Sequence, residues 1–229
     1  YLWGLGEVPS SWPAAALEAQ VIAARTYALG KLSKIRIECD CNIYNSTADQ
    51  NFVGYAKETE AIYGIKWKEA VNRTFVDENN SLVITSDGKF INSFYFSSSG
   101  GNTQNIAEVW GSSFSYLQGV PDPWSLDPLI NRRYAVWSRF IPQETMALAF
   151  ALPNVVSFSI NSLSATGSVT SITGFSSTGV SATLTGEIFR ARVKLPSTWI
   201  LNKKPYVRFP EKATECPLII SVKIPTCLY

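Results

Sequence analysis

Residues 1–29 read YLWGLGEVPSSWPAAALEAQVIAARTYAL, and this stretch decides how the N-terminal part of the chain folds. Over residues 13–32 the apolar side chains recur at helical spacing, which predicts a helix with one buried face. The members of that face are Leu17, Val21, Ala24, Ala28 and Leu32. Pro13 suits the first helical position, with Ser10 and Ser11 near the cap. One carboxylate, Glu7, precedes the helix on a turn set by Gly6 and Pro9, and its isolation has to be explained.

The composition is that of a globular protein without a nucleic-acid partner. Apolar residues make up 46% of the 229 residues, which is enough for a sizeable core. The net charge is +2 and no basic run exceeds two residues, so a binding surface for nucleic acid is not expected. We find neither an apolar stretch long enough to span a membrane nor a signal peptide. The abrupt start inside a motif indicates a fragment of a longer protein.

The remaining pattern predicts an α+β fold. Helices are expected over residues 57–62, 67–74 and 142–152, and a hairpin over residues 82–96 turns at Asp87-Gly88. Residues 155–195 alternate apolar side chains with Ser or Thr between glycines, which predicts antiparallel strands. Because helices and hairpins mix without βαβ alternation, we expect one α+β domain over residues 1–229. Its helix-rich part covers about residues 1–80 and its strand-rich part about residues 81–200, with a tail over residues 201–229.

Histidine is absent from the sequence, and this narrows the possible chemistry. Ser-His-Asp and Cys-His catalysis need an imidazole base, and HExxH proteases need imidazole ligands. We therefore expect no metal and no cofactor, and a reaction that relies on Glu, Asp, Tyr, Lys, Ser or Cys. Serine catalysis is also disfavoured, because GxSxG is absent as well.

The four cysteines form two close pairs, Cys39 with Cys41 and Cys216 with Cys227. An even count in local pairs predicts disulfides and an oxidising compartment. A bridge between Cys216 and Cys227 would tie down the tail. The one-residue spacer between Cys39 and Cys41 makes a local bridge there harder, and four cysteines allow three pairings, so the connectivity stays open.

Glu7 and Arg25 each admit two interpretations. Glu7 is either a surface or capping carboxylate near a helix N-terminus, or a general acid in an apolar setting given by Trp3, Val8 and Trp12. Arg25 is either a surface arginine or a clamp on a substrate or on Glu7.

A loop at residues 97–103 (SSSGGNT) offers hydroxyls and glycine amides for a polar ligand. Tyr95, Trp110, Tyr116 and Trp124 are close to it in sequence. Most such aromatics belong to a core, but those on a groove wall would suit sugar rings, which have apolar faces and hydroxyl edges.

Several motifs together resemble the SpoIID/LytB family (stage II sporulation protein D and the amidase enhancer). The resemblance covers residues 1–150 well and is looser up to residue 199. The motifs that carry it are residues 7–9 (EVP), 12–13 (WP), 19–28 (AQVIAARTYA), 94–103 (FYFSSSGGNT), 109–111 (VWG), 116–120 (YLQGV) and 123–124 (PW).

This resemblance implies a lytic transglycosylase that cleaves peptidoglycan glycan strands, with peptide-free strands preferred. It implies that Glu7 is the catalytic residue and that a set of cleft residues binds the substrate. That set is Arg25, Ser97, Ser98, Ser99, Gly100, Gly101, Thr103, Tyr116 and Gln118. Some members carry zinc on histidine and cysteine, and without histidine we do not transfer that site. Other members enhance a cell-wall amidase, so a non-catalytic wall-binding module is the alternative.

The implied chemistry explains why Glu7 stands alone. Hydrolytic glycosidases use two carboxylates, whereas one suffices when the C6 hydroxyl of the sugar replaces water as the nucleophile. The products would then be 1,6-anhydro sugars. Under either interpretation the partners are glycan strands, with a cell-wall amidase in the alternative. The location is outside the cytoplasmic membrane, in a secreted or membrane-anchored parent protein.

Overall fold

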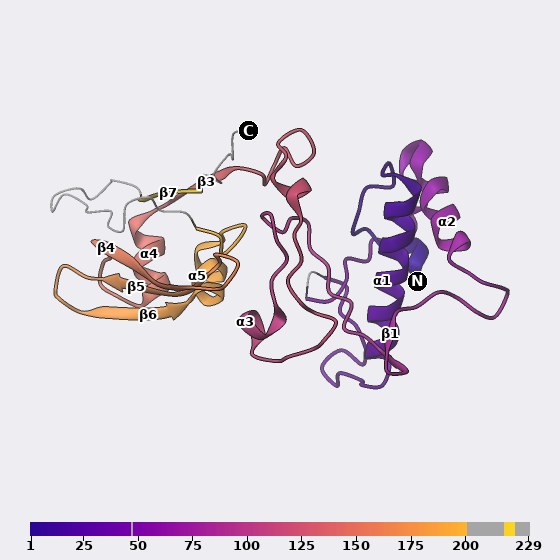
Figure 1. Ribbon diagram of the computed structural model, residues 1–229, viewed down its shortest axis with the longest axis horizontal. Helices are drawn as coiled ribbons and strands as arrows, with labels where there is room; N and C mark the ends of the chain where they lie inside the picture. Colours follow the sequence, from indigo (N-terminus) through magenta and orange to yellow (C-terminus); the bar gives the residue numbers. More distant parts are fainter. Residues whose placement is uncertain (47, 201–217, 223–229) are drawn as a thin grey trace. The chain divides into compact units, whose positions relative to one another are not determined.

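The computed structural model describes residues 1–46, residues 48–200 and the backbone of residues 218–222 (Figure 1). Within it the chain divides into two compact units, residues 1–96 and residues 97–229, and each has its own hydrophobic core. A single domain over the whole chain stays a prediction. Cys216 and Cys227, which were expected to tie the tail, lie outside the described residues.

The first unit is built on helix α1 (Ala14–Lys31), and the helix expected over residues 13–32 is confirmed. Leu17, Val21 and Ala24 are almost completely buried, as their helical spacing requires. They pack on helix α2 (Gly64–Arg73), which lies beside α1 (Figure 1) and contributes Trp67. Burial of a side chain the size of Leu17 or Val21 stabilises the unit by roughly 2 kcal/mol.

Short elements complete the first unit. The helix expected over residues 57–62 is wrong: the chain forms two 3₁₀ turns there, η2 (Gly54–Lys57) and η3 (Ala61–Tyr63). The hairpin is confirmed at its turn, where Asp87 and Gly88 both have positive φ between strands β1 (Thr85–Ser86) and β2 (Lys89–Phe90). Its strands are shorter than expected because flanking groups bond to α1 instead. For example, the Ile84 N–H donates to the Thr26 hydroxyl at 3.0 Å.

The second unit contains an antiparallel sheet of three strands in the order β4 (Ser157–Leu163), β5 (Val169–Phe175) and β6 (Ser181–Thr185). Helices α4 (Gln143–Phe150) and α5 (Gly186–Val193) pack on each other and on this sheet. The expected helix over residues 142–152 and the expected strands before residue 186 are confirmed. Residues 186–193, however, are helical, because the Thr185 hydroxyl accepts from the Ile188 N–H and caps α5.

Four further elements of the second unit had no sequence prediction. They are helix α3 (Ile106–Trp110), the 3₁₀ turn η4 (Pro123–Leu126) and two strands that pair antiparallel, β3 (Trp137–Ile141) and β7 (Leu218–Val222). Together the helices and antiparallel sheets confirm the α+β class. Among the described helices, none combines the length and apolar character that crossing a membrane requires.

Candidate functional site

Glu7 lies on a loop between the 3₁₀ turn η1 (Leu2–Gly4) and α1, and this loop is fixed by main-chain bonds to residues 50–53. The Gly6 N–H donates to the Asn51 carbonyl at 2.8 Å, and the Val53 N–H donates to the Gly4 carbonyl at 2.8 Å. Gly4 has no room for a side chain, because a Cβ there would lie 2.4 Å from the Phe52 ring. The backbone under Glu7 is therefore held by a segment more than 40 residues away.

The half-buried carboxylate of Glu7 takes its hydrogen bonds on one oxygen. Oε1 accepts from the Asn51 N–H at 2.6 Å and from the Tyr95 hydroxyl at 3.3 Å. Both hydrogen bonds that the described residues make to this carboxylate go to Oε1. The capping interpretation is wrong, because α1 begins at Ala14 and no side chain caps it.

Gln50 connects the surroundings of Glu7 into one chain of hydrogen bonds. Its side chain is 1% exposed and its Oε1 accepts from the Tyr1 hydroxyl at 2.5 Å. Its Nε2 donates to the Tyr95 hydroxyl oxygen at 2.9 Å and to the Ala24 carbonyl of α1 at 3.2 Å. The amide thus makes three hydrogen bonds, which a buried polar group of this kind needs in order to be stable.

Tyr1 and Tyr95, the two tyrosines that bond to Gln50, keep their hydroxyl protons at neutral pH. Burial raises the pKa of Tyr95, and the nearby Glu7 raises it further, while the N–H of Gln50 acts in the opposite direction. Burial of its hydroxyl end likewise raises the pKa of Tyr1 to about 12, with Glu7 and Asp49 adding to the effect. Tyr1 as a whole is 55% exposed, so its ring is accessible while its hydroxyl faces the buried Gln50. Both phenols are therefore hydrogen-bond donors.

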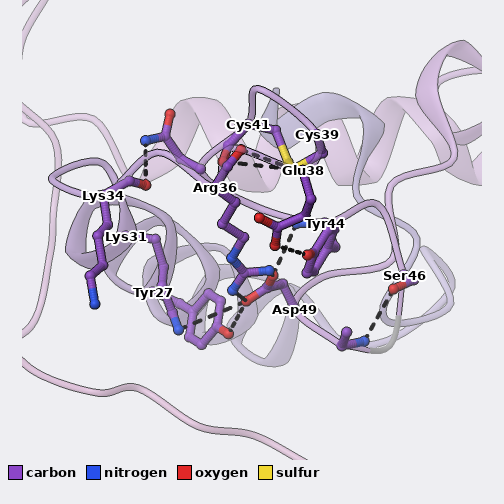
Figure 2. A network of polar contacts seen from close by, with 12 residues as sticks. Tyr27, Lys31, Lys34, Arg36, Glu38, Cys39, Cys41, Tyr44, Ser46 and Asp49 are labelled. Carbon is purple, nitrogen blue, oxygen red and sulfur yellow. Dashed lines mark hydrogen bonds and ion pairs between the residues drawn. A yellow bond between two sulfur atoms is a disulfide. The ribbon is translucent and has the colours of Figure 1, made fainter.

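The residue before Gln50, Asp49, is the centre of a second polar cluster (Figure 2). Its side chain is 1% exposed and accepts from Arg36 at 2.7 Å, from the Tyr27 hydroxyl at 2.6 Å and from the Tyr44 N–H at 2.9 Å. Lys31 lies 3.8 Å away. Burial alone would raise the pKa of Asp49, but these donors outweigh it and lower the pKa. The cluster fixes the chain immediately before Gln50 and Asn51.

A disulfide between Cys39 and Cys41 lies next to this cluster (Figure 2). The sequence left the pairing of these cysteines open, and the structure shows that they pair with each other. The two Cα atoms are 5.2 Å apart. Around it the Arg36 N–H donates to the Cys41 carbonyl at 2.8 Å, so the main chain also closes the loop. The Tyr44 hydroxyl donates to Glu38 beside it.

In the second unit, most of the expected hydroxyl loop is occupied with holding its own shape. The buried Ser99 hydroxyl donates to Asp122 at 2.7 Å, and the Ser125 hydroxyl lies 2.8 Å from it. The Gly101 N–H donates to the Ser125 hydroxyl at 2.7 Å, and the Thr103 hydroxyl accepts from the Val120 N–H at 2.8 Å. These hydrogen bonds hold the loop in its shape.

The outer side of the loop lines a small pocket of about 90 Å³. Its lining includes Ser97, Ser98 and Gly100 together with Tyr134, Trp137, Pro196, Ser197 and Trp199. Gly100 has φ +73° and lies against the Trp199 ring, where a Cβ would be 3.5 Å from it. Two other expected residues lie outside this lining: Gln118 bonds to Asn105 and the Phe114 carbonyl, and the ring of Tyr116 packs on Phe114.

Comparison with known proteins agrees with the motifs. Residues 5–76 match the model of the SpoIID family, described as Stage II sporulation protein. Over these residues the chain is similar to the SpoIID/LytB family. The chain is 34% identical over 124 residues to the Amidase enhancer of Bacillus subtilis strain 168, and 27% identical over 129 residues to Stage II sporulation protein D of the same strain.

These similarities cover part of each protein. They include 54% of this chain and 15% of the Amidase enhancer, and 52% of this chain and 36% of Stage II sporulation protein D. The SpoIID match over residues 5–76 contains Glu7, Arg25, Gln50 and Asn51, and it ends before Tyr95 and the hydroxyl loop. Glu7 and one of its two hydrogen-bond donors, Asn51, therefore fall within the matched segment.

Arg25 of the SpoIID segment is buried at 6% exposure, so the surface interpretation is wrong. Its guanidinium donates to the Leu82 carbonyl at 2.8 Å, to the Thr74 hydroxyl at 2.8 Å and to the Thr74 carbonyl at 3.5 Å. It also lies 5.2 Å from the centre of the Phe75 ring. Burial lowers the pKa of Arg25. Its hydrogen bonds within the described residues join α1 to the chain beyond α2 and do not reach Glu7.

Arg25 also lines a cavity of about 740 Å³ in the first unit. The remaining lining is mostly apolar: Tyr1, Leu2, Trp3, Ala28, Leu29, Leu32, Asn42, Ile43, Val71, Asn72 and Phe75. Glu7 does not line this cavity, so the cavity and the expected catalytic carboxylate are separate features. Tyr1 lines this cavity, and its hydroxyl donates to Gln50, which in turn donates to the Tyr95 hydroxyl beside Glu7.

The described residues include no group of three or more Cys, Asp or Glu side chains that could hold a metal ion. The sulfurs of Cys39 and Cys41 are bonded to each other.

Sequence reasoning did not identify Gln50 and Asn51 as parts of the site, and it named Tyr95 only as one of several aromatics near the loop. Gln50 lies in an irregular stretch with no periodic or motif signal, and its bonds to Ala24 and Tyr95 span 26 and 45 residues. Contacts of such separation leave no local pattern in one sequence.

Proposed function

We propose that this chain is the catalytic part of a peptidoglycan lytic transglycosylase, with Glu7 as its general acid and base. The observation that carries the proposal is the arrangement of Glu7 inside the SpoIID segment. The carboxylate is half-buried, and the Asn51 N–H and the Tyr95 hydroxyl both bond to Oε1. A carboxylate fixed through one oxygen keeps the other oxygen for proton transfer to a substrate.

The proposed reaction needs no second carboxylate. Glu7 donates its proton to the glycosidic oxygen as the bond from that oxygen to the anomeric carbon of N-acetylmuramic acid breaks. The C6 hydroxyl oxygen of the same sugar then bonds to the anomeric carbon, and its proton passes to the Glu7 carboxylate. Glu7 ends in its starting form, and the products are a free 4-hydroxyl on N-acetylglucosamine and a 1,6-anhydro end. Water is not consumed.

The other expected residues enter this proposal with different roles. Ser97, Ser98 and Gly100 contact the glycan, because they line the small pocket of the second unit. Ser99, Gly101 and Thr103 hold the loop in its shape, while Tyr116 and Gln118 contact Phe114. Arg25 is proposed to contact the substrate in the larger cavity that it lines. Peptide-free strands, in which the sugar edges are accessible, are the proposed substrate.

The test is mass spectrometry of peptide-free glycan strands incubated with wild type and with Glu7→Gln. Anhydro-ended fragments from wild type alone support the proposal. A matched control is Glu69→Gln on α2, where the carboxylate forms an exposed ion pair with Arg73, and it should cleave like wild type. Fragments from Glu7→Gln at the wild-type rate would refute the role of Glu7.

A second candidate function is a non-catalytic module that binds wall glycan and enhances an amidase. The observation that favours it is the 34% identity to a protein named Amidase enhancer. Under this alternative, wild type and Glu7→Gln both bind the strands and neither cleaves them. Addition of a cell-wall amidase then gives faster release of stem peptides in the presence of the chain.

Both candidates require a location outside the cytoplasmic membrane, where peptidoglycan is found. The disulfide between Cys39 and Cys41 supports this location, because such bonds persist in oxidising compartments. The parent protein is proposed to be secreted or anchored to the membrane.

A further inference from the structure

We propose that Gln50 is a positioning residue that directs the hydroxyl proton of Tyr95 onto the Glu7 carboxylate, and that Tyr1 holds the Gln50 amide in the orientation this requires. The inference rests on the proposed function, because it describes how the same carboxylate is held. It adds three residues that act on Glu7 through one chain of hydrogen bonds.

The direction of the chain follows from what each atom can do. The NH₂ group of an amide only donates and its oxygen only accepts. The Ala24 carbonyl lies 3.2 Å from one end of the Gln50 amide and can only accept, so that end must be the NH₂ group. A flipped amide would set two carbonyl oxygens against each other. The opposite end is therefore the oxygen, and it accepts from the Tyr1 hydroxyl at 2.5 Å.

The orientation of Gln50 in turn fixes the proton of Tyr95. The NH₂ group donates to the Tyr95 oxygen at 2.9 Å, so this oxygen is the acceptor in that contact. The phenolic proton must then point elsewhere, and Glu7 Oε1 at 3.3 Å is the acceptor. If Gln50 instead presented an acceptor to Tyr95, the phenol would donate to residue 50 and Glu7 would lose this bond.

Burial keeps this arrangement in place. Gln50 is 1% exposed, and its amide has a protein partner on both the oxygen and the nitrogen. Water has little access to such a group, so the amide cannot exchange its partners as a surface glutamine does. The consequence for Glu7 is that Oε1 is engaged with Asn51 and Tyr95 throughout, and the proton transferred in the reaction is carried by Oε2.

The first measurement is a double-mutant cycle on glycan cleavage with Tyr95→Phe, Gln50→Met and the combination. Loss of the hydrogen bond to a charged group predicts a fall in kcat on the order of tenfold for Tyr95→Phe, with KM little altered. Gln50→Met removes the donor that orients the phenol but not the phenol itself, so it should give a smaller fall in the same direction. Because Gln50 acts through the Tyr95 hydroxyl, the double variant should be no slower than Tyr95→Phe alone. A Gln50 role in folding only would instead make the two effects multiply.

Two further variants serve as controls. Tyr1→Phe tests the same hydrogen bonds at a position where the fold should be unaffected, and Tyr44→Phe tests the general effect of removing a tyrosine hydroxyl. Tyr1→Phe removes the donor to the Gln50 oxygen from a residue that is 55% exposed, so the fold should tolerate it. It should reduce kcat in the same direction as Gln50→Met. Tyr44→Phe removes a hydroxyl that donates to Glu38, outside the hydrogen bonds that run from Tyr1 to Glu7, and it should match wild type.

The second measurement does not depend on cleavage. In protein labelled with ¹³C-tyrosine, the Tyr95 hydroxyl proton should give a slowly exchanging NMR signal that Tyr95→Phe removes and Glu7→Gln shifts. Gln50→Met, and more weakly Tyr1→Phe, should speed its exchange. A signal unchanged by Gln50→Met, or effects on kcat that multiply, would overturn the inference and leave the Glu7 proposal intact. Wild type that cleaves no glycan would overturn the proposed function. The NMR signal would still test whether Gln50 and Tyr1 orient the Tyr95 hydroxyl toward Glu7.

Discussion

Replacement of Arg25 separates a structural role of this residue from a role in clamping a substrate. Its guanidinium makes two hydrogen bonds at 2.8 Å, to the Leu82 carbonyl and to the Thr74 hydroxyl. No carboxylate lies within ion-pair distance of it among the described residues, so the partners are neutral. If the role is structural, the fork shape of the guanidinium is what matters, and charge alone cannot replace it.

The two substitutions Arg25→Lys and Arg25→Met should therefore rank in an order that charge conservation would not predict. Lysine keeps the cost of burying a cation but cannot reach both acceptors, so it should lower the free energy of unfolding by about 3 kcal/mol. Methionine leaves the buried Thr74 groups without a donor, at about 1–3 kcal/mol, but it removes the buried charge. We expect a net loss of about 2 kcal/mol for methionine.

Urea unfolding followed by tryptophan fluorescence measures these losses, since Trp67 lies in the core of the same unit. Arg73→Met is the control: Arg73 is exposed and pairs with Glu18 and Glu69 on the surface, so its loss should cost less than 1 kcal/mol. A clamp on substrate predicts the opposite result. In that case Arg25→Lys would be as stable as wild type and would retain glycan binding, whereas Arg25→Met would fold normally and lose binding.

Two other predictions concern the same unit. Gly64→Ala should destabilise it by more than about 2 kcal/mol in urea unfolding, because a Cβ at Gly64 would lie 2.0 Å from the Glu58 carbonyl; Gly88→Ala at the open hairpin turn should cost less. Since the pKa of Asp49 is lowered on folding, its contribution to stability is complete above about pH 5 and is lost as the pH falls below about 4. Asp49→Asn should make unfolding free energies less dependent on pH between 5 and 3, and an unchanged dependence would show that other carboxylates dominate.

The parts of the fold that the sequence predicted are those with a local cause. Helix α1 follows from apolar side chains at helical spacing, and the turn at Asp87 and Gly88 follows from residues that accept positive φ. Helix α5 was missed because the alternation of β6 continues to Thr185, and the cap at Thr185 changes the structure in one residue. Periodicity is judged over several residues, so it cannot locate a change from strand to helix that occurs at one residue.

Among the candidate site residues, too, only features with a local cause were predicted. Glu7 and the hydroxyl loop were predicted from motifs, but their surroundings were not. The donors to Glu7 come from Asn51 and Tyr95, which are 44 and 88 residues away in the chain. Arg25 was predicted from its motif, yet its burial depends on the path of the chain after α2, which no local pattern specifies.

The irregular segment over residues 32–53 shows how contacts between distant residues hold a site that has no local sequence pattern. It contains no helix or strand among its described residues, and loops of this length in a compact fold usually serve a function. Asp49 and the Cys39–Cys41 disulfide hold it by side-chain contacts in place of a backbone ladder. The two residues that follow Asp49 are Gln50 and Asn51, which together position the carboxylate of Glu7. A regular helix or strand would use the Asn51 N–H for its own hydrogen bonds, so an irregular backbone is what leaves this donor available to Glu7.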